Sequence, residues 1–343
     1  MKPITIRRVV FLGPLQAALE TCELDGNLPL RAALVRSEYS LLSPGTELAL
    51  YTGTHIGFKD PEITWARYPL FPGYATIGII EALGAGLASE PGFPKPGDRI
   101  LHYKPHAEAA IIDADRDFWI PIPRGMKSEP SLFARFAQIA RTAVEASQTE
   151  GNVLVLGAGI IGNLAGQLFR ELKSTKVLIA DPSAERLALA SRCGLVNAID
   201  NSAGNLQKVI AEMTGNRGVS VVIEATGIPS LVIDSLLAVN KGGEVVLLGS
   251  ARGKVELDVY KLIHRKATIL IGAHEGRYPQ RAAAGKPSHE LFARDALARI
   301  GSGSLVVEPF FTDRISPEGI LAMYDTLLKD GANHIGVVVE WKK

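Results

Sequence analysis

Cysteine is scarce in this sequence. Its 343 residues include two, Cys22 and Cys193, which lie far apart and form no paired motif. A fold held together by disulfides, or a structural zinc site with four cysteine ligands, needs more than two cysteines. We therefore expect two free thiols in a protein that works in a reducing compartment.

A surplus of charge of either sign is also lacking. The chain has 37 basic and 36 acidic residues. This balance gives no electrostatic reason to expect nucleic acid or an anionic membrane as a partner. No run approaches the ~20 apolar residues that span a bilayer, and the N-terminus has no apolar signal core. We expect a cytoplasmic protein whose hydrophobic residues, 47% of the chain, suffice for the cores of two domains.

The most informative stretch runs from Val153 to Arg186. Apolar residues 153–156 predict a buried strand, and residues 176–180 predict a second strand that ends at Asp181. Between the strands lies a helical pattern, which is preceded by the turn Gly157-Ala158-Gly159-Ile160-Ile161-Gly162. A glycine turn in this position is typical of dinucleotide-binding units, whereas the same glycines without a strand and a helix around them would be weak evidence.

Each glycine of this turn has a physical role. Gly157 permits the sharp turn out of the strand, Gly159 lets a pyrophosphate approach the backbone, and Gly162 lets the helix pack on the sheet. The free N–H groups at the helix start, at Ile160 and Ile161, hold the phosphate charge. The turn therefore predicts a pyrophosphate site.

Asp181 bears on which dinucleotide binds. It stands 19 residues after Gly162, where a carboxylate bonds the adenosine ribose hydroxyls and repels a 2′-phosphate. Proline follows it, and no arginine comes directly after it to receive a 2′-phosphate. We therefore expect NAD as the cofactor, in preference to NADP.

The rest of the chain divides by its periodicity. Short strands and turns dominate residues 1–120, and residues 130–148 have helical spacing. From residue 151 strands and helices alternate, which favours a parallel sheet with helices on both faces. Two more helices, near 288–300 and 317–329, and a closing strand at 336–340 are predicted, and we expect this tail to return to the first domain.

Several motifs together resemble the medium-chain dehydrogenase/reductase superfamily, which includes the zinc alcohol and polyol dehydrogenases. They are Ser43-Pro44-Gly45-Thr46-Glu47, Phe71-Pro72-Gly73-Tyr74, Lys95-Pro96-Gly97-Asp98-Arg99, the glycine turn, Glu224-Ala225-Thr226-Gly227 and Gly242-Gly243-Glu244-Val245-Val246. The resemblance covers nearly the whole chain. It implies an α/β protein with a GroES-like β-rich catalytic domain, at residues 1–139 and 277–343, and a Rossmann NAD-binding domain with a doubly wound parallel sheet, at residues 140–276.

The zinc-using members of that superfamily have three ligand positions that this chain does not keep. The cysteine position carries Pro44, the histidine position carries Tyr74, and the third position lies near Gln138. Ala75 stands where the family has a glutamate directly after that histidine. Catalytic zinc needs three protein ligands from cysteine, histidine, aspartate or glutamate. We therefore predict no metal. The chain resembles a zinc-free subgroup, similar to the dehydrogenases that oxidise the hydroxyethyl group of a bacteriochlorophyllide.

Four residues are the candidates for catalysis that the resemblance implies. Thr46 matches a residue that passes a proton, or else it only satisfies backbone groups in its turn. Tyr74 is either a general acid or a tyrosine that fills the vacated metal space. Glu47 matches an acid behind the metal ligands, and an ion pair with a nearby arginine is the alternative. His55 is either a base or a surface-loop histidine.

Five further residues are expected to bind the cofactor. Arg186 matches a basic residue on the adenosine side, and Thr142 matches a residue beside the nicotinamide. Thr226, Gly249 and Ser250 follow predicted strands, at the sheet edge where ligands bind in open α/β sheets.

These observations predict a zinc-independent, NAD-dependent oxidoreductase that interconverts a secondary alcohol and a ketone. One alternative is an enone or quinone reductase, which usually prefers NADP. Another is a dinucleotide-binding protein without catalysis. The expected partners are a small-molecule substrate and further copies of the chain in a homodimer or homotetramer, with residues 255–257 as an edge strand for pairing.

Overall fold

The structure is a computed structural model that describes residues 2–173 and 175–341. The chain forms two compact units, Met1–Ala134 with Phe311–Lys343, and Arg135–Phe310. The boundaries predicted from the sequence are 139/140 and 276/277. In the structure residues 277–310 stay with the second unit, because Arg141 binds Asp295 (3.3 Å) and the Gln167 side chain bonds both backbone groups of Val306.

The first unit is built around a seven-stranded sheet. Strand order is β14-β15-β3-β4-β5-β7, β6 also pairs with β3, and β1 and β2 form a separate antiparallel pair. The strands are β1 (Ile4–Gly13), β2 (Gln16–Leu24), β3 (Ala32–Leu41), β4 (Thr76–Leu83), β5 (Arg99–His102), β6 (Ala109–Asp113), β7 (Trp119–Pro121), β14 (Phe311–Ile315) and β15 (Gly336–Glu340). The helices are α1 (Pro44–Tyr51), η1 (Ile56–Phe58), α2 (Ala85–Ala88), α3 (Ser128–Ser131), η5 (Pro317–Gly319) and α10 (Ile320–Asp330).

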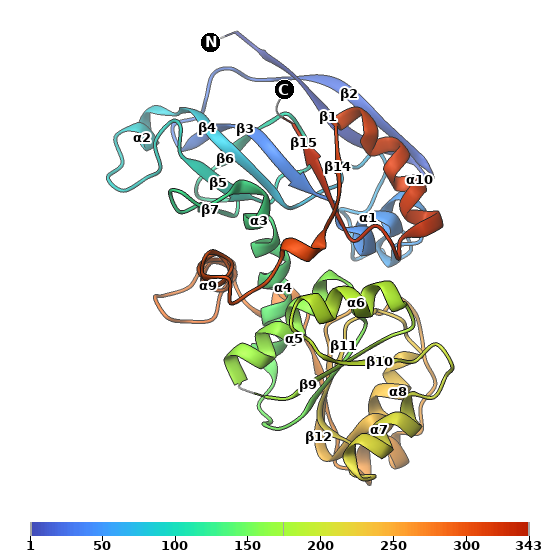
Figure 1. The fold of residues 1–343 in the computed structure, drawn as a ribbon. Helices are drawn as coiled ribbons and strands as arrows, with labels where there is room; N and C mark the ends of the chain where they lie inside the picture. The colour runs from blue at the N-terminus through green and yellow to red at the C-terminus, as the bar shows by residue number, and fades with distance from the viewer. Residues whose placement is uncertain (1, 174, 342–343) are drawn as a thin grey trace. The chain divides into compact units, whose positions relative to one another are not determined.

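An aromatic cluster fixes α1 against α10 in this unit. The rings of Phe11, Tyr51 and Tyr324 lie with centroids 5.0–5.4 Å apart. Figure 1 shows α10 beside α1 and the β1–β2 pair. The expected return of the tail to the first domain is thus seen in β14, α10 and β15.

The second unit has a six-stranded sheet in the order β10-β9-β8-β11-β12-β13, and every neighbouring pair is parallel. The strands are β8 (Val153–Leu156), β9 (Val177–Asp181), β10 (Asn197–Asp200), β11 (Val219–Glu224), β12 (Val239–Leu247) and β13 (Ile269–Gly272). The remaining elements are α4 (Phe133–Ala146), α5 (Ile160–Lys173), α6 (Ala184–Arg192), α7 (Leu206–Thr214), α8 (Leu231–Ala238), η2 (Tyr260–His264), η3 (Glu275–Arg277), α9 (His289–Ser302) and η4 (Glu308–Phe310).

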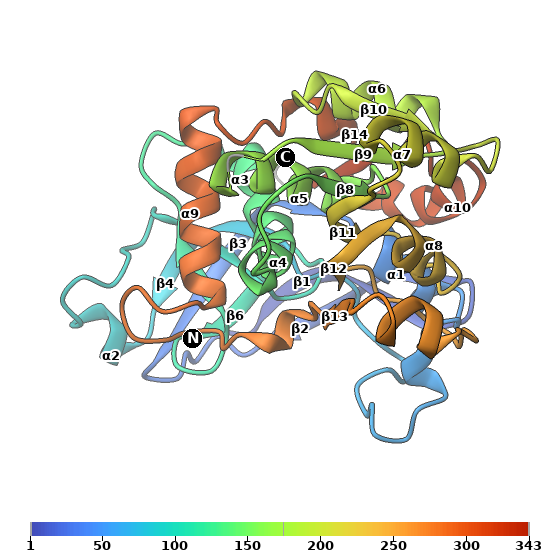
Figure 2. The same ribbon diagram turned by 90° about the horizontal axis from the view of Figure 1, so that it is seen from below.

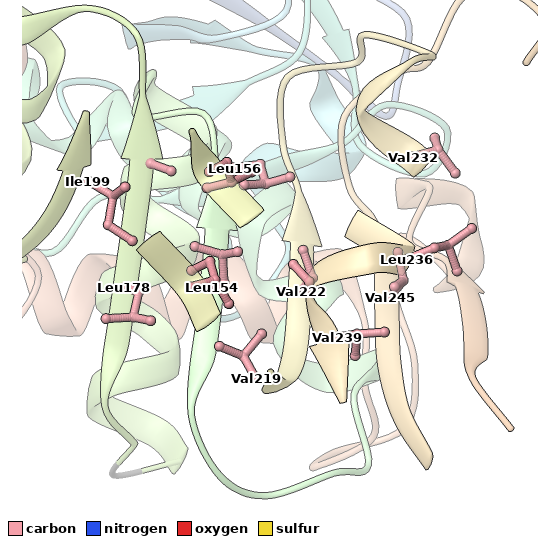
Figure 3. Close-up of a cluster of buried hydrophobic side chains, with 14 of the residues drawn as sticks. Leu154, Leu156, Leu178, Ile199, Val219, Val222, Val232, Leu236, Val239 and Val245 are labelled. Atoms are coloured by element: carbon pink, nitrogen blue, oxygen red, sulfur yellow. The ribbon is translucent and has the colours of Figure 1, made fainter. Parts of the chain in front are cut away.

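Apolar strand residues make the core of this unit. Figure 3 shows Leu154, Leu178, Val222 and Val245 projecting from four neighbouring strands into one cluster. Helices lie on both faces of the sheet, and α9 runs beside α4 in both ribbon views (Figures 1 and 2). The predicted fold class, a GroES-like β-rich domain with a Rossmann domain, is confirmed.

One local prediction is wrong. Residues 255–257 form no strand, and the edge strands of the six-stranded sheet are β10 and β13. Among the described helices, none has the length and apolar character required to cross a membrane.

Candidate active site

The glycine turn lies where the strand order of the second unit reverses. The strands β9 and β10 lie to one side of β8, and β11 lies to the other. Gly157 follows β8 with φ +99°, and a Cβ on it would be 2.8 Å from Cγ2 of Thr226, which follows β11. Ligands of open α/β sheets bind at such a reversal, beyond the carboxyl ends of the strands.

The other turn residues have the expected surroundings. A Cβ on Gly159 would meet no atom within 4 Å, so a ligand can approach its backbone closely. A Cβ on Gly162 would lie 1.9 Å from the carbonyl oxygen of Gly157, so the helix start packs directly on the turn. Ile160 and Ile161 open α5, with Ile160 buried. These backbone groups fit a pyrophosphate at the start of α5.

Asp181 ends β9 with both carboxylate oxygens bonded to backbone. Oδ2 accepts the N–H of Ala158 at 2.8 Å, and Oδ1 accepts that of Ser183 at 2.9 Å. Each carboxylate oxygen has a second lone pair, which leaves acceptor capacity for ribose hydroxyls. Nη1 of Arg186 lies 3.9 Å from Oδ2, so a cation adjoins the carboxylate.

Glu224 organises the strand ends, a role that the sequence analysis missed. Its buried carboxylate accepts the N–H groups of Thr226 (2.7 Å) and Gly227 (3.1 Å), and it also binds the Thr226 hydroxyl. A Cβ on Gly249 would lie 2.3 Å from the Gly227 nitrogen. The loops after β11 and β12 therefore lie in contact, with Ser250 exposed beside them.

Thr142 stands apart from these strand ends. It is buried in α4, and its hydroxyl donates to the carbonyl oxygen of Gln138 at 3.5 Å, one helical turn earlier. The second unit thus gathers Gly157, Asp181, Thr226 and Gly249 at the carboxyl ends of the strands of its sheet. Among the described residues, no hydrogen bond joins the Thr142 side chain to those strand ends.

In the first unit, Tyr74 meets the start of α1. Its hydroxyl is hydrogen-bonded to Oγ of Ser43. Thr46 lies three residues further, half-buried in the first turn of α1, and its N–H donates to the carbonyl oxygen of Ser43 at 3.1 Å. Three hydroxyl groups therefore belong to the segment that enters α1 and to the residue packed against it.

The carboxylate of Glu47, in the same helix as Thr46, belongs to a buried hydrogen-bond network. It accepts the N–H of Ser43 (2.8 Å) and the hydroxyl of Tyr324 (2.6 Å), and it lies 3.1 Å from Nε2 of His106. Nδ1 of His106 bonds Ser40 at 2.7 Å. The expected ion pair with an arginine is wrong, because histidine, tyrosine and backbone donors satisfy the carboxylate.

His106 was not a candidate from the sequence, yet it fills the space beside Gly73 and Tyr74. Gly73 has φ +98°, and a Cβ on it would lie 2.6 Å from the His106 ring. Only glycine lets the ring lie flat against this turn. The His106 backbone N–H also bonds the carbonyl oxygen of Pro72 at 2.9 Å.

His55 has a local structural role. Its Nδ1 accepts the N–H of Gly57 at 3.0 Å, which starts the short η1 helix. The side chain is 8% exposed and its ring lies 5.1 Å from that of Trp65. The histidine is therefore buried at the start of η1, so the surface-loop alternative is wrong.

Comparisons with known proteins agree with this architecture. Residues 161–285 match the sequence family described as zinc-binding dehydrogenase. An L-threonine 3-dehydrogenase of Alteromonas mediterranea is 28% identical over 238 residues, which cover 69% of this chain and 64% of that protein. The chain thus spans less than two thirds of that relative's length.

Solved structures match along the whole chain. A 2R,3R-butanediol dehydrogenase of Bacillus subtilis has a TM-score of 0.80 at 18% identity, over 98% of this chain and 99% of that one. A dehydrogenase of Sinorhizobium meliloti bound to NADP has a TM-score of 0.77 at 21% sequence identity. An alcohol dehydrogenase of Escherichia coli CFT073 with NADH has a TM-score of 0.79 at 18% sequence identity. Both comparisons cover 98% of this chain and 99% of the other. The chain therefore shares the fold of these dehydrogenases.

Zinc is implied by the matched family, but the donors of this chain do not fit it. In that fold the expected ligand positions carry Pro44, which has no donor, Tyr74, which binds Ser43, and Gln138, which accepts from Arg135. Both oxygens of Glu47 are engaged, Oε1 by the N–H of Ser43, Oε2 by the hydroxyl of Tyr324, and each by Nε2 of His106. Within residues 2–173 and 175–341, no group of three or more histidines, cysteines or acids is placed to hold a metal ion.

Proposed function

We propose that this protein is a zinc-independent, NAD-dependent oxidoreductase that interconverts a small secondary alcohol and a ketone in the cytoplasm. In the oxidative direction, a hydride with its two electrons passes from the carbinol carbon to NAD⁺, and the hydroxyl proton passes to a protein group. The observation that carries the proposal is the glycine turn at the reversal of a six-stranded parallel sheet, with Asp181 at the end of the adjacent strand. A relative that is an L-threonine 3-dehydrogenase supports the dehydrogenase class.

The preference for NAD follows from the charge at the end of β9. The Asp181 carboxylate suits two ribose hydroxyls and opposes the dianionic 2′-phosphate of NADP. Arg186 lies 3.9 Å from it and reduces that opposition, and solved relatives contain NADH in one case and NADP in another. We therefore propose preferential binding of NADH, with measurable NADPH binding.

Hydrogen bonding replaces metal chemistry in this proposal. When a ketone is reduced, negative charge develops on its oxygen, and donors aimed at that oxygen stabilise the transition state. Tyr74 and Thr46 are the hydroxyl groups that we assign to this task. In the reductive direction the hydride forms the new C–H bond, and the proton of one of these hydroxyls forms the new O–H bond.

Substitution of single hydroxyls tests the assignment. Tyr74→Phe and Thr46→Val keep the shape of each side chain and delete the donor. If a donor is lost, the rate of NADH oxidation in a single turnover should fall roughly 10²- to 10³-fold. NADH affinity should stay unchanged in both variants.

Two further measurements test whether the protein works without zinc and whether it is an enzyme. Elemental analysis of the purified protein should find far less than about one zinc per chain, the amount that a catalytic site holds. A screen of alcohols and ketones that follows NADH absorbance should find turnover. Tight NADH binding without turnover on a broad panel would instead support a dinucleotide-binding protein without catalysis.

A further inference from the structure

Ser43 occupies the N-cap position of α1, but its side chain makes no hydrogen bond to the backbone of that helix. Two other N-cap serines do so: Ser183 accepts the N–H of Arg186 and Ser288 accepts that of Leu291, both at 3.2 Å. Serine is favoured at this position because its oxygen accepts such a bond. The Ser43 hydroxyl is directed to Tyr74 instead.

The backbone N–H groups in the first turn of α1 find acceptors other than the Ser43 hydroxyl. Pro44 has no N–H to satisfy, and the N–H groups of Thr46 and Glu47 both bond the carbonyl oxygen of Ser43, at 3.1 and 2.8 Å. The Glu47 carboxylate reaches back to the N–H of Ser43. Because His106 and Tyr324 hold that carboxylate, the backbone of Ser43 is fixed on both sides.

The direction of the Ser43–Tyr74 bond follows from burial. The Ser43 side chain is 6% exposed, and the one acceptor that the described residues offer its hydrogen is the Tyr74 oxygen. If Tyr74 were the donor, the hydrogen of Ser43 would be buried without an acceptor, which is rare and unfavourable. Ser43 therefore donates, and Tyr74 keeps its own hydrogen for another acceptor.

We propose that Ser43 is a positioning residue that acts through Tyr74. It holds the Tyr74 oxygen in place and stabilises the phenolate that forms when Tyr74 gives its proton to the ketone oxygen. In that step the hydride of NADH makes the C–H bond, the Tyr74 O–H bond breaks, and the alcohol O–H bond forms. Water then returns a proton to Tyr74. This inference rests on the proposed function for the reaction, but the hydrogen bond can be tested without it.

The kinetic test compares Ser43→Ala with Ser43→Thr. Loss of one hydrogen bond to a developing charge should lower the single-turnover rate roughly tenfold in Ser43→Ala. The substrate KM and NADH affinity should stay the same, and the rate-pH profile should move to higher pH. Ser43→Thr retains a hydroxyl and should recover most of the rate.

Ser288→Ala is the matched control, because Ser288 is also a buried N-cap serine. It should lower the melting temperature, since its hydroxyl caps α9, and leave the rate-pH profile unchanged. Ser43→Ala should show the opposite pattern, a slower reaction at nearly unchanged melting temperature. A destabilised Ser43→Ala protein with normal turnover per folded molecule would overturn the inference.

A spectroscopic test needs no turnover. Tyrosinate absorbance is titrated in the wild type and in Tyr74→Phe, so that their difference isolates Tyr74 among the eight tyrosines. In the Ser43→Ala background this difference titration should move up by about one pH unit, the equivalent of one hydrogen bond to the phenolate. An unchanged titration contradicts the inference. A shifted titration in a protein that turns over no substrate supports the Ser43–Tyr74 bond and overturns the proposed function alone.

Discussion

The hydroxyl of Tyr324 donates to a carboxylate that has no access to water. Tyr324 and Glu47 are both buried, and their bond is 2.6 Å long. Burial, followed by the charge of Glu47, raises the pKa of Tyr324 well above its ordinary value, so the phenol remains a donor at every physiological pH. The position is sensitive because a buried charge that loses a partner is not compensated by solvent.

Tyr324→Phe should therefore lower the free energy of unfolding by about 1.5–3 kcal/mol, the range for hydrogen bonds to charged groups. Urea unfolding measures the change. Tyr51→Phe is the control, since Tyr51 belongs to the same aromatic cluster but donates to Asp325 at 2.9 Å, where the bond is partly buried. Equal losses in the two variants would show that Glu47 does not depend on Tyr324.

Asp181 combines a structural and a proposed binding role. Asp181→Ala removes the acceptor of the Ala158 and Ser183 N–H groups, so we expect a loss of about 1–3 kcal/mol of stability. It also removes the charge that opposes a 2′-phosphate. The ratio of NADPH to NADH affinity, measured by titration of protein fluorescence, should therefore rise.

Asp200→Ala controls for that experiment. Asp200 ends the neighbouring strand, opposite Asp181 in the register, and accepts the N–H of Ser202 in a similar turn. Its removal should leave the NADPH to NADH ratio unchanged. A wild type that prefers NADPH, or equal changes in both variants, would contradict the role assigned to Asp181.

His102 makes stability depend on pH. Burial, and to a smaller extent the charge of Lys104, lowers the pKa of His102 to about 3, against about 6.5 in the unfolded chain. Between these values the unfolded chain binds the proton more readily, so the free energy of unfolding should fall as the pH falls from about 6.5 towards 3. The loss approaches ~1.4 kcal/mol per pH unit for one such group.

His102→Asn should flatten this part of the stability–pH curve measured by urea unfolding. Asparagine does not titrate, and its oxygen can accept the Lys104 N–H that Nδ1 of His102 accepts at 3.2 Å. His264→Asn removes an exposed histidine and should leave the slope as it is. A slope that persists in His102→Asn would assign the pH dependence to other groups.

At the scale of elements, sequence patterns located the second unit well. The strand β8 has the predicted bounds, because a continuous apolar run that ends at a glycine is typical of a strand buried on both faces of a parallel sheet. The glycine turn follows β8 as predicted, since strand, turn and helix form a local pattern. Residues 255–257 alternate as a strand would but form none, because three residues are too few to decide pairing.

The buried network of the first unit was beyond such patterns. His106 lies 59 residues and Tyr324 277 residues from Glu47 in the chain. No local spacing marks such contacts, so an ion pair with an arginine stayed one of two interpretations of the acid, and neither His106 nor Tyr324 received a role. The Ser43–Tyr74 bond is of the same kind, because it depends on the loop 42–43 meeting the turn at Gly73.

At the scale of the whole molecule, an unpaired sheet edge bears on assembly. In the described chain β13 pairs on one side only, with β12, and Ile269 and Leu270 are 50% and 41% exposed. Such an edge is a template for pairing with another strand. A second copy related by a two-fold axis can pair its own β13 antiparallel to this one, which closes the edge and joins two sheets.

We therefore expect a homodimer that pairs through β13, rather than through residues 255–257, and light scattering coupled to gel filtration measures the mass. Ile269→Lys places a charge on the edge strand and should shift the protein to monomer, because charged side chains at an edge prevent pairing. Val196→Lys changes an equally apolar side chain of the same unit, 75% exposed and outside any strand, and should leave the mass unchanged. A dimer that survives Ile269→Lys would place the interface elsewhere, and a monomeric wild type would show that the β13 edge stays unpaired in solution.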